Sequence, residues 1–208
     1  MPHKVPTHIC HMTHIDNLPS IITAGGLMSH TSIRQKGIGY TDISLQSVQE
    51  KRNKPVPCAA GGTLHDYVPF YFHPKNPMQY TIMKGNVAQY QNGIKELLLL
   101  CTTAQAIDEA DIQFAFTDRH AVLALADFHS DLSDLNLLNW DILGAQYWNN
   151  FPDGREVRQA EFLAYKKVPW NLVHHIGVYD KVILQRVMDI IKASTHKPNV
   201  EVTPGWFF

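Results

Sequence analysis

A Gln-x-Glu triplet stands at the head of an apolar, strand-like run: Gln159, Ala160 and Glu161 precede residues 162–165. On a strand, side chains alternate between faces, so Gln159 and Glu161 point the same way while Ala160 points into the packing. A carboxylate in this position is costly unless it has a task or a partner. One such task is the cleavage of a glycosidic C–N bond in a dinucleotide, where a fixed negative charge stabilises an oxocarbenium-like centre. The simpler alternative is a surface strand with an ordinary Glu.

A second candidate site lies where the first predicted strand ends and a helix begins. Residues 8–13 predict the strand, and residues 18–24 predict a short helix with Asp16 as its N-cap and Gly25 at its end. Such a junction offers unpaired N–H and C=O groups that can hold an amide and a ribose. A capped helix beside a core histidine explains the same residues equally well.

Residues 29–55 are polar and have no clear period, which predicts a long loop of a kind that often carries function. Within it, Lys51, Arg52 and Lys54 place three cations in four residues. They could hold a pyrophosphate or a nucleic-acid backbone. The alternative is a solvated turn, which is what most charge runs are.

An aromatic run follows the glycine pair Gly61–Gly62. Residues 67–72 predict a strand that ends before Pro74, and residues 76–80 begin a helix with Pro77 in its first turn. The glycines permit a close backbone approach, and the aromatic rings could form a stacking wall. Most of these rings fit an aromatic core strand better; Tyr71 is retained as a binding residue.

Residues 116–121 and the polar segment that follows them predict the other side of a groove. Thr117 or Asp118 is expected to cap a helix over residues 119–128, with His120 in its first turn. Residues 129–158 are rich in Asp, Asn and Trp and lead directly to the Glu161 strand, so they could shape a substrate groove. The aromatic residues of this segment (Trp140, Tyr147 and Trp148) are expected to pack rather than stack on bases.

The remaining pattern is a mixture of strands and helices. Further strands are predicted at 95–102, 113–117, 162–165, 176–179 and 200–202, and further helices at 104–110, 132–138, 140–147 and 181–191. The pattern is α+β, because strands and helices do not alternate as βαβαβ. Without a GxGxxG motif, a Rossmann dinucleotide site is not expected.

The bulk properties fit one domain over residues 1–208. The 45% of hydrophobic residues can build a core, and the net charge of −1 means that any nucleic-acid contact must come from a local patch.

The twelve histidines show no metal-ligand spacing such as HExxH, so no metal is expected. Cys10, Cys58 and Cys101 form no CxxC pair, which favours thiols in a reducing cytosol over a disulfide scaffold. Neither a signal-like stretch nor a membrane span is apparent, so a cytoplasmic protein is expected.

Five segments taken together resemble the DarT family of DNA ADP-ribosyltransferase toxins. They occur in the same order as in the family and span nearly the whole chain, so together they are specific although each alone is weak. The segments are Thr13–Leu18, Gly61–Phe72, Pro77–Met78, Phe116–Ala121 and Arg158–Leu163.

The resemblance implies an ADP-ribosyltransferase fold, in which two packed, mostly antiparallel sheets with flanking helices hold NAD in a split between them. It implies NAD as the donor of ADP-ribose, without a metal, and a thymine base in single-stranded DNA as the acceptor. It also implies a macrodomain antitoxin that removes the modification.

The resemblance also assigns roles to individual residues. The family's catalytic glutamate corresponds to Glu161, and its catalytic arginine corresponds best to Arg52, with Lys51 and Lys54 close in register. The expected NAD contacts are His11, Met12, Thr13, His14, Asn17, Arg52 and Tyr71. The expected substrate contacts are Lys51, Lys54, Arg119, His120, Arg155 and Arg158. Arg119 departs from the family pattern, which has a small residue there.

Two other classes of function remain open from the sequence. One is an ADP-ribosyltransferase that modifies another base, RNA or protein, or that simply hydrolyses NAD; it shares the donor site and differs only in the acceptor groove. The other is a nucleic-acid-binding module without catalysis. A buried Glu161 and the lack of a continuous basic stripe disfavour that module.

Overall fold

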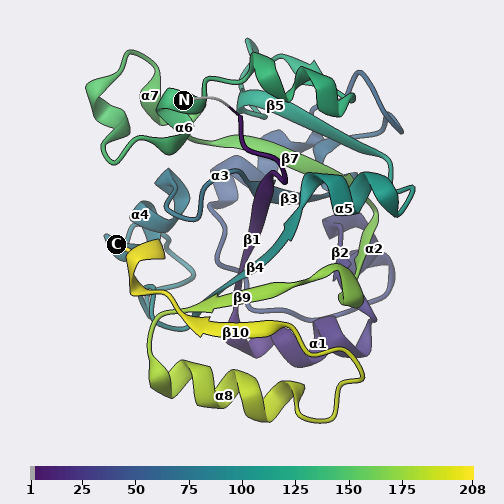
Figure 1. The fold of residues 1–208 in the computed structure, drawn as a ribbon, viewed down its shortest axis with the longest axis vertical. Helices are drawn as coiled ribbons and strands as arrows, with labels where there is room; N and C mark the ends of the chain where they lie inside the picture. The colour runs from purple at the N-terminus through teal and green to yellow at the C-terminus, as the bar shows by residue number, and fades with distance from the viewer. Residues whose placement is uncertain (1–2) are drawn as a thin grey trace.

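The fold is built on a large twisted sheet with helices and irregular segments around it (Figure 1). The structure is a computed structural model that describes residues 3–208. Its larger sheet has eight strands in the order β10-β9-β4-β1-β3-β7-β5-β6, and β2 and β8 form a second, two-stranded sheet. Only the β9–β10 pair is parallel. The strands are β1 (His8–His14), β2 (Gly26–Met28), β3 (Tyr67–Tyr71), β4 (Leu97–Thr103), β5 (Phe114–His120), β6 (Phe128–His129), β7 (Ala160–Tyr165), β8 (Lys167–Pro169), β9 (His175–Val178) and β10 (Asn199–Val202).

The eight-stranded sheet is divided between β1 and β3. All seven residues of β1 pair with β4, whereas β1 meets β3 only where Cys10 lies opposite Tyr71. The sheet therefore consists of two halves, β10-β9-β4-β1 and β3-β7-β5-β6, that separate beyond this one pairing. We call the opening between β1 and β3 the split. The α+β class, with two strand layers that part around a cleft, is confirmed.

The helices are short apart from α8 (Lys181–Ile191), which begins after Asp180, whose carboxylate accepts from the amides of Val182 and Ile183. Its apolar face packs near α1 and β10 at one end of the molecule (Figure 1). The other α-helices are α1 (Leu18–Thr23), α2 (His30–Gln35), α3 (Gln46–Gln49), α4 (Pro77–Met83), α5 (Ala104–Glu109), α6 (Trp140–Gly144) and α7 (Gly154–Val157). The 3-10 turns are η1 (Ile15–Asn17), η2 (Glu50–Asn53), η3 (Leu64–Asp66), η4 (Leu132–Leu137), η5 (Trp148–Asn150), η6 (Trp170–Leu172) and η7 (Pro204–Trp206).

An aromatic core holds β7 rigidly between β3 and β5. Phe162 is fully buried, stacks on Phe114 with a centroid distance of 5.0 Å, and meets Phe72 edge-on at 6.4 Å. Such ring pairs stabilise a core beyond the area that they bury. The residue that precedes Phe162 in the strand, Glu161, therefore starts from a fixed backbone.

The predicted helix over residues 119–128 is wrong. The strand β5 runs to His120, and the chain then turns to form the short strand β6. Asp118 closes this connection, since its carboxylate accepts from the amide of Asp127 at 3.0 Å. The apolar residues between 119 and 128 do not share one buried face: Ala121 is buried, whereas Leu125 is exposed.

Other boundaries also differ from the sequence predictions. Residues 29–55 are not a continuous loop, since they contain α2, α3 and η2. Residues 132–137 form a 3-10 helix, and the helix expected at 140–147 ends at Gly144. Asp16 does not cap α1. Asn17 occupies the N-cap position, and its side chain makes no hydrogen bond to the first turn of the helix.

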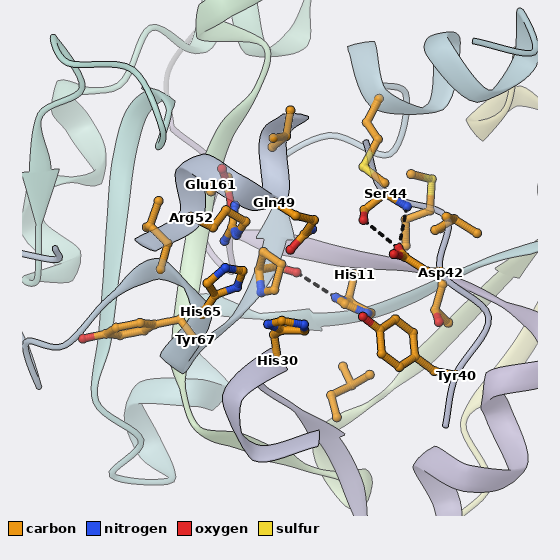
Figure 2. Close-up of a pocket in the computed structure, with 18 of the residues that line it drawn as sticks. His11, His30, Tyr40, Asp42, Ser44, Gln49, Arg52, His65, Tyr67 and Glu161 are labelled. Atoms are coloured by element: carbon orange, nitrogen blue, oxygen red, sulfur yellow. Dashed lines mark hydrogen bonds and ion pairs between the residues drawn. The ribbon is translucent and has the colours of Figure 1, made fainter. Parts of the chain in front are cut away.

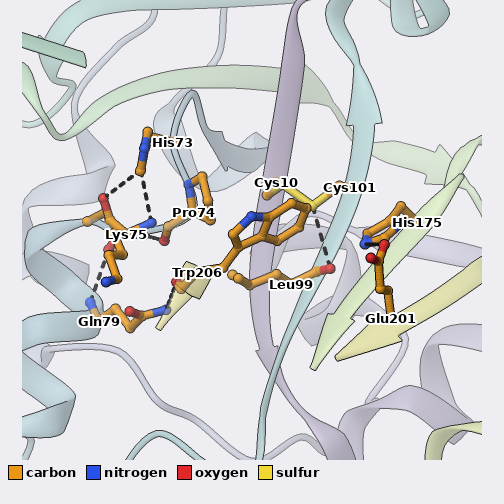
Figure 3. The surroundings of a disulfide bond; sticks show 11 residues. Cys10, His73, Pro74, Lys75, Gln79, Leu99, Cys101, His175, Glu201 and Trp206 are labelled. Carbon is orange, nitrogen blue, oxygen red and sulfur yellow. Dashed lines mark hydrogen bonds and ion pairs between the residues drawn. A yellow bond between two sulfur atoms is a disulfide. The ribbon is translucent and has the colours of Figure 1, made fainter. Parts of the chain in front are cut away.

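The expectation of unbonded thiols is wrong for two of the three cysteines. Cys10 and Cys101 form a disulfide between β1 and β4, and Cys58 is free. The two bonded residues face each other directly in the strand register, 4.1 Å apart between Cα atoms. Wide spacing in the sequence concealed this pair, because register between strands brings distant residues together. Trp206 lies beside the disulfide in Figure 3. Over residues 3–208, the structure shows no helix long and apolar enough to cross a membrane.

Candidate active site

A cavity of about 480 Å³ occupies the split, which is within the usual size range of small-molecule sites. Residues from both halves of the sheet line it, together with the segment between α1 and η2 (Figure 2). The expected site residues that the structure brings to this cavity are His11, Met12, Thr13, Asn17, Arg52, Tyr71, His120, Arg155 and Glu161.

Glu161 lies at the floor of the cavity and is only 1% exposed. Its Oε2 accepts from Arg52 Nη1 at 2.9 Å, and its Oε1 accepts from the backbone amide of Ala121 at 3.3 Å. His120 Nε2 lies 3.8 Å from Oε1. The carboxylate is thus paired and fixed in orientation, which satisfies the condition under which a protein tolerates a buried charge.

A bulge in β5 fixes the backbone beneath Glu161. The register between β5 and β7 shifts between Phe116 and His120, so the regular ladder is interrupted opposite Glu161. The Thr117 hydroxyl replaces the missing acceptor and takes the amide hydrogen of Glu161 at 3.1 Å. Bulges often redirect a side chain near a site in this way.

Arg52 comes from η2 and is 7% exposed. Only one of its terminal nitrogens is used by Glu161; its Nη2 is buried and has no hydrogen-bond partner within residues 3–208. A buried guanidinium nitrogen without an acceptor is costly, so an acceptor on a bound molecule would complete this group. The cavity therefore presents one free, positively charged donor next to a carboxylate.

The edge of β1 forms the opposite wall of the split. Beyond Cys10, β1 keeps its pairing with β4 on one side and has no strand partner on the other among the described residues. Residues 11–13 line the cavity along this edge. An unpaired strand edge offers alternating backbone donors and acceptors, which suits a carboxamide. His11 crosses the split: its Nδ1 lies 2.8 Å from the carbonyl oxygen of Pro69, and its ring meets that of Phe70 edge-on at 5.8 Å.

Asn17 supports the site by fixing a neighbouring segment. Its side-chain oxygen accepts from the Thr41 amide at 2.7 Å, and its side-chain nitrogen donates to the Thr41 carbonyl at 3.0 Å. The same nitrogen also donates to the Thr13 hydroxyl at 3.1 Å. These bonds hold residues around Tyr40 and Asp42 against the cavity, where both line the wall.

Four histidines line the cavity, and burial is the main cause that lowers the pKa of each: His11, His30, His65 and His120. The rings of His30 and His65 lie 4.4 Å apart, and a charge on His30 lowers the pKa of His65. Arg52 lowers the pKa of His65 and His120 further. These imidazoles are therefore neutral at pH 7 and leave Arg52 as the dominant positive charge at the floor.

Tyr71 lies opposite Glu161 in the register of β3 and β7. Burial, and then the charge of Glu161, raise the pKa of the Tyr71 phenol, so the hydroxyl keeps its proton. That hydroxyl points to the sulfur of Met78 at 3.6 Å, a weak interaction that a better acceptor can replace.

Three expected contacts in the N-terminal part lie outside the cavity lining. His14 is buried and faces Asp16 and Glu96, at 3.4 Å each. Lys51 is exposed. Lys54 donates to the carbonyl oxygens of Ala121 and Leu123, at 2.9 and 2.5 Å.

The ammonium group of Lys54 is therefore bound to backbone carbonyl oxygens and does not face the cavity as a free cation. It follows η2, which carries Arg52, and its ammonium holds the turn whose Ala121 amide binds Glu161. One side chain thus ties together the two segments that contact the carboxylate.

Arg119 and Arg158 also lie outside the lining. Arg119 bonds Asp118 at 2.9 Å and lies 4.0 Å from Glu156. Arg158 is buried and donates to the carbonyl oxygens of Lys75 at 2.9 Å and Ala145 at 3.0 Å. It therefore joins the β3–α4 connection to the α6–η5 connection, and these are contacts of a structural kind.

Several lining residues were missed by the sequence analysis. Some of them come from residues 29–55, which the sequence predicts as a long loop: Tyr40, Asp42, Ser44 and Gln49. Its length and polarity were the only signal for function. His30 and His65 were missed because a histidine in a polar segment has no distinctive spacing. Within residues 3–208, no group of three or more His, Cys, Asp or Glu side chains is arranged to hold a metal ion.

Comparisons with known proteins agree with this geometry. Residues 10–208 match the sequence model of the family described as "ssDNA thymidine ADP-ribosyltransferase, DarT". The chain is 43% identical to a DNA ADP-ribosyl transferase of Thermus sp. (strain 2.9), covering 98% of this chain and 97% of that protein. It is also 25% identical to a DNA ADP-ribosyl transferase–DNA ADP-ribosyl glycohydrolase fusion protein of Thermosipho africanus, covering 93% of this chain and 47% of the fusion.

Solved structures show the same fold. The Thermus sp. 2.9 DarT in complex with ADP-ribosylated ssDNA superposes with a TM-score of 0.95, at 40% identity, covering 100% of this chain and 99% of that one. The same Thermus protein in complex with NAD+ gives a TM-score of 0.89, at 39% identity, covering 99% and 100% of the two chains.

Proposed function

The chain belongs to the DarT family of single-stranded DNA thymidine ADP-ribosyltransferases, and we propose that it transfers ADP-ribose from NAD to a thymine base in single-stranded DNA. The observation that carries this proposal is the buried pair of Arg52 and Glu161 at the floor of the split. A binding module without catalysis has no need of a buried carboxylate that faces a small-molecule cavity.

The cavity fits NAD in size and in the groups that it presents. Arg52 Nη2 is buried and has no hydrogen-bond partner within residues 3–208. A phosphate oxygen of NAD is a suitable acceptor for it. The edge of β1 at residues 11–13 suits the carboxamide of nicotinamide. A relative of 39% identity binds NAD+ with the same fold, which supports the assignment.

Glu161 is assigned to the charge that develops in the reaction. NAD supplies an ADP-ribosyl group on a cationic nicotinamide, a leaving group that departs as a neutral molecule. The C–N bond breaks, positive charge grows at the anomeric carbon, and the fixed carboxylate stabilises it. The bonds from Arg52 and Ala121 hold the carboxylate before the reaction, so no reorganisation is needed.

The acceptor side of the cavity is formed by His120, Arg155 and Gln159. A thymine nitrogen becomes nucleophilic when it loses its proton, which must pass to a group nearby. The family resemblance gives Arg52 a part in this relay: since its guanidinium already carries its proton, it can orient the base, and it can take the proton of thymine only as it gives one of its own to a neighbouring acceptor. His120 lies beside Glu161 and stays neutral at pH 7, so its ring can face the base without repelling Arg52.

The proposed partner is an enzyme that removes the modification. The Thermosipho africanus relative carries a DNA ADP-ribosyl glycohydrolase in the same chain as its transferase. We propose that this chain works with a glycohydrolase of the macrodomain type as its antitoxin, in the cytoplasm, and that residues 1–208 act as one domain.

The test is to incubate the protein with NAD and short oligonucleotides that contain thymine or only other bases, and to read products by intact mass. The expected result is addition of one ADP-ribose to thymine-containing single strands and little to the others. Modification of RNA, of protein, or of guanine-only strands at equal rate would replace thymine as the acceptor. Free ADP-ribose without any adduct would indicate NAD hydrolysis.

A further inference from the structure

A cluster of rings and cations lies on α4 and at the C-terminus, outside the lining of the cavity. The ring of Phe208 meets Tyr80 edge-on at 5.3 Å, and Lys75 Nζ lies 5.5 Å from its centroid. Lys84 Nζ in turn lies 5.4 Å from the Tyr80 centroid. We call Lys75, Tyr80, Lys84 and Phe208 the α4 platform. In Figure 1, α4 and the C-terminus lie together at one side of the molecule.

The α4 platform is a surface and not a part of the core. Tyr80 is 41% exposed, Lys84 is exposed, and Phe208 is half-buried. Beneath it, Trp148 is buried and supports Phe208 at 5.6 Å between ring centroids. A rigid aromatic surface of this kind costs little conformational entropy when a planar group stacks on it.

The α4 platform begins where the cavity ends. Met78 and Thr81 of α4 line the cavity on one side, and Arg155 and Gln159 line it on the other. Arg158 joins these two walls, through the carbonyl of Lys75 and that of Ala145. The α4 platform therefore shares α4 with one wall of the cavity, so it lies within reach of a strand whose thymine occupies the cavity. Figure 3 shows Lys75 and Gln79 near Trp206 of the C-terminal segment, and Gln79 donates to the Trp206 carbonyl at 3.2 Å.

The segment of the sequence that contains α4 carries formal charge of one sign. From residue 67 to residue 95 the sequence contains no Asp and no Glu, while it contains Lys75, Lys84 and Lys95. This contrasts with a net charge of −1 for the whole chain. Alternation of cations and exposed rings is the pattern that binds single-stranded nucleic acid, by phosphate pairing and base stacking without sequence preference.

We propose that the α4 platform binds the nucleotides on one flank of the modified thymine, so that the enzyme holds a longer DNA strand than its cavity contacts. This proposal rests on the proposed function and extends it from one base to a stretch of strand. Unpaired bases are needed, since only they expose faces to Tyr80 and Phe208; a duplex would present backbone alone.

The experiment compares oligonucleotides with one thymine that differ only in flank length. A short strand ends two nucleotides from the thymine on both sides, and longer strands carry roughly six further nucleotides on the 5′ or on the 3′ side. The wild-type protein should modify one of the two longer strands with a kcat/KM about tenfold higher than the short strand, and the gain should appear in KM.

The variant Tyr80→Ser with Lys84→Ser should lose most of this gain and keep its rate on the short strand, because neither residue lines the cavity. Tyr80→Phe should retain the gain, since it keeps the ring. The salt dependence of the long strand should become shallower when Lys84 is removed, by about 0.7 in the log–log slope. Lys181→Ser, on the exposed face of α8, is the matched control and should change nothing.

Three outcomes would overturn the proposal. The flank length could have no effect in the wild-type protein. The double variant could keep the full gain. It could also lose activity equally on short and long strands, which would mean that α4 acts on the cavity. If no strand is modified at any length, the proposed function itself fails. Platform variants that weaken inhibition by the partner glycohydrolase but spare the flank effect would assign this surface to a protein.

Discussion

Arg52 Nη1 and Glu161 Oε2 meet at 2.9 Å although 109 residues separate them in the sequence. Both side chains are almost fully buried. The cost of removing two such ions from water approaches or exceeds their attraction, so a buried pair does little for net stability. Its position at the floor of the split, with one guanidinium nitrogen still unpartnered within residues 3–208, supports the role in binding and charge stabilisation that we propose for it.

Arg52→Ala should reduce both NAD binding and transfer, and it should lower stability by about 3–5 kcal/mol, since Glu161 would be left buried without its cation. Arg52→Lys restores the charge but not the planar fork, so it should recover only part of the transfer rate. Calorimetry and a turnover assay on the same samples measure both effects. A wild-type transfer rate in the Arg52→Lys protein would mean that only the positive charge of Arg52 matters and not its planar guanidinium.

Lys54→Met should slow turnover and leave NAD affinity almost unchanged. The methionine keeps the apolar stem and removes the ammonium that holds the carbonyls of Ala121 and Leu123. The Ala121 amide then loses its fixed position against Glu161, which affects the transition state more than the bound substrate. Lys51→Met, an exposed neighbour outside the cavity, is the control. Equal loss in kcat and NAD affinity would place Lys54 at the phosphates, as the sequence suggested.

The two arginines on the acceptor side should behave differently. Arg155 lines the cavity, so Arg155→Ser should weaken the use of oligonucleotides with little change in NAD binding. Arg119 is already paired with Asp118 and near Glu156, so Arg119→Ser should leave the oligonucleotide profile and its salt slope within about twofold of the wild type. A loss of DNA use in the Arg119 variant larger than in the Arg155 variant would reverse this assignment.

Stability should fall on mild acidification, and His73 should contribute to the fall. Burial, and then the charge of Arg158, lower the pKa of His73 to about 4, below the ordinary value of 6.5. Between these two pKa values the unfolded chain binds a proton at His73 and the folded chain does not. The contribution of His73 to the free energy of unfolding is therefore fully present above about pH 6.5 and is lost towards pH 4, by about 3 kcal/mol.

The check is the melting temperature between pH 7.5 and about pH 4.5, for the wild type and for His73→Asn. The asparagine keeps a polar group near Arg158 but does not titrate, so the variant should show a shallower decline. Parallel curves for the two proteins would mean that His73 has no part in the acid sensitivity. The buried cavity histidines contribute to the decline that remains.

The sequence predicted those parts of the site that depend on local pattern. The Gln-x-Glu triplet before an apolar run placed Glu161 on a strand, and the junction after the first strand was predicted as a binding site because it offers unpaired N–H and C=O groups. The helix α8 was predicted with its observed bounds, because its apolar spacing and its Asp180 cap are local features.

What the sequence could not provide depends on register and on turns. The bond between Cys10 and Cys101 follows from which residues of β1 and β4 lie opposite each other. The bulge that gives Glu161 its Thr117 partner has no sequence signature, and residues 119–128 were mistaken for a helix. Lys54 and Arg158 were read as substrate cations because a charge does not reveal whether it faces a phosphate or a carbonyl.

The central claim is that the Glu161 carboxylate stabilises the transition state of ADP-ribose transfer from NAD. The direct measurement is a single-turnover reaction of Glu161→Gln with NAD and a thymine-containing oligonucleotide, read by intact mass, together with NAD affinity by calorimetry. Glutamine keeps the shape and the acceptor oxygen and removes the charge. The account predicts a rate at least about a hundredfold lower with NAD affinity within a few-fold of the wild type. Transfer at a near wild-type rate in a folded, NAD-binding Glu161→Gln protein would contradict it.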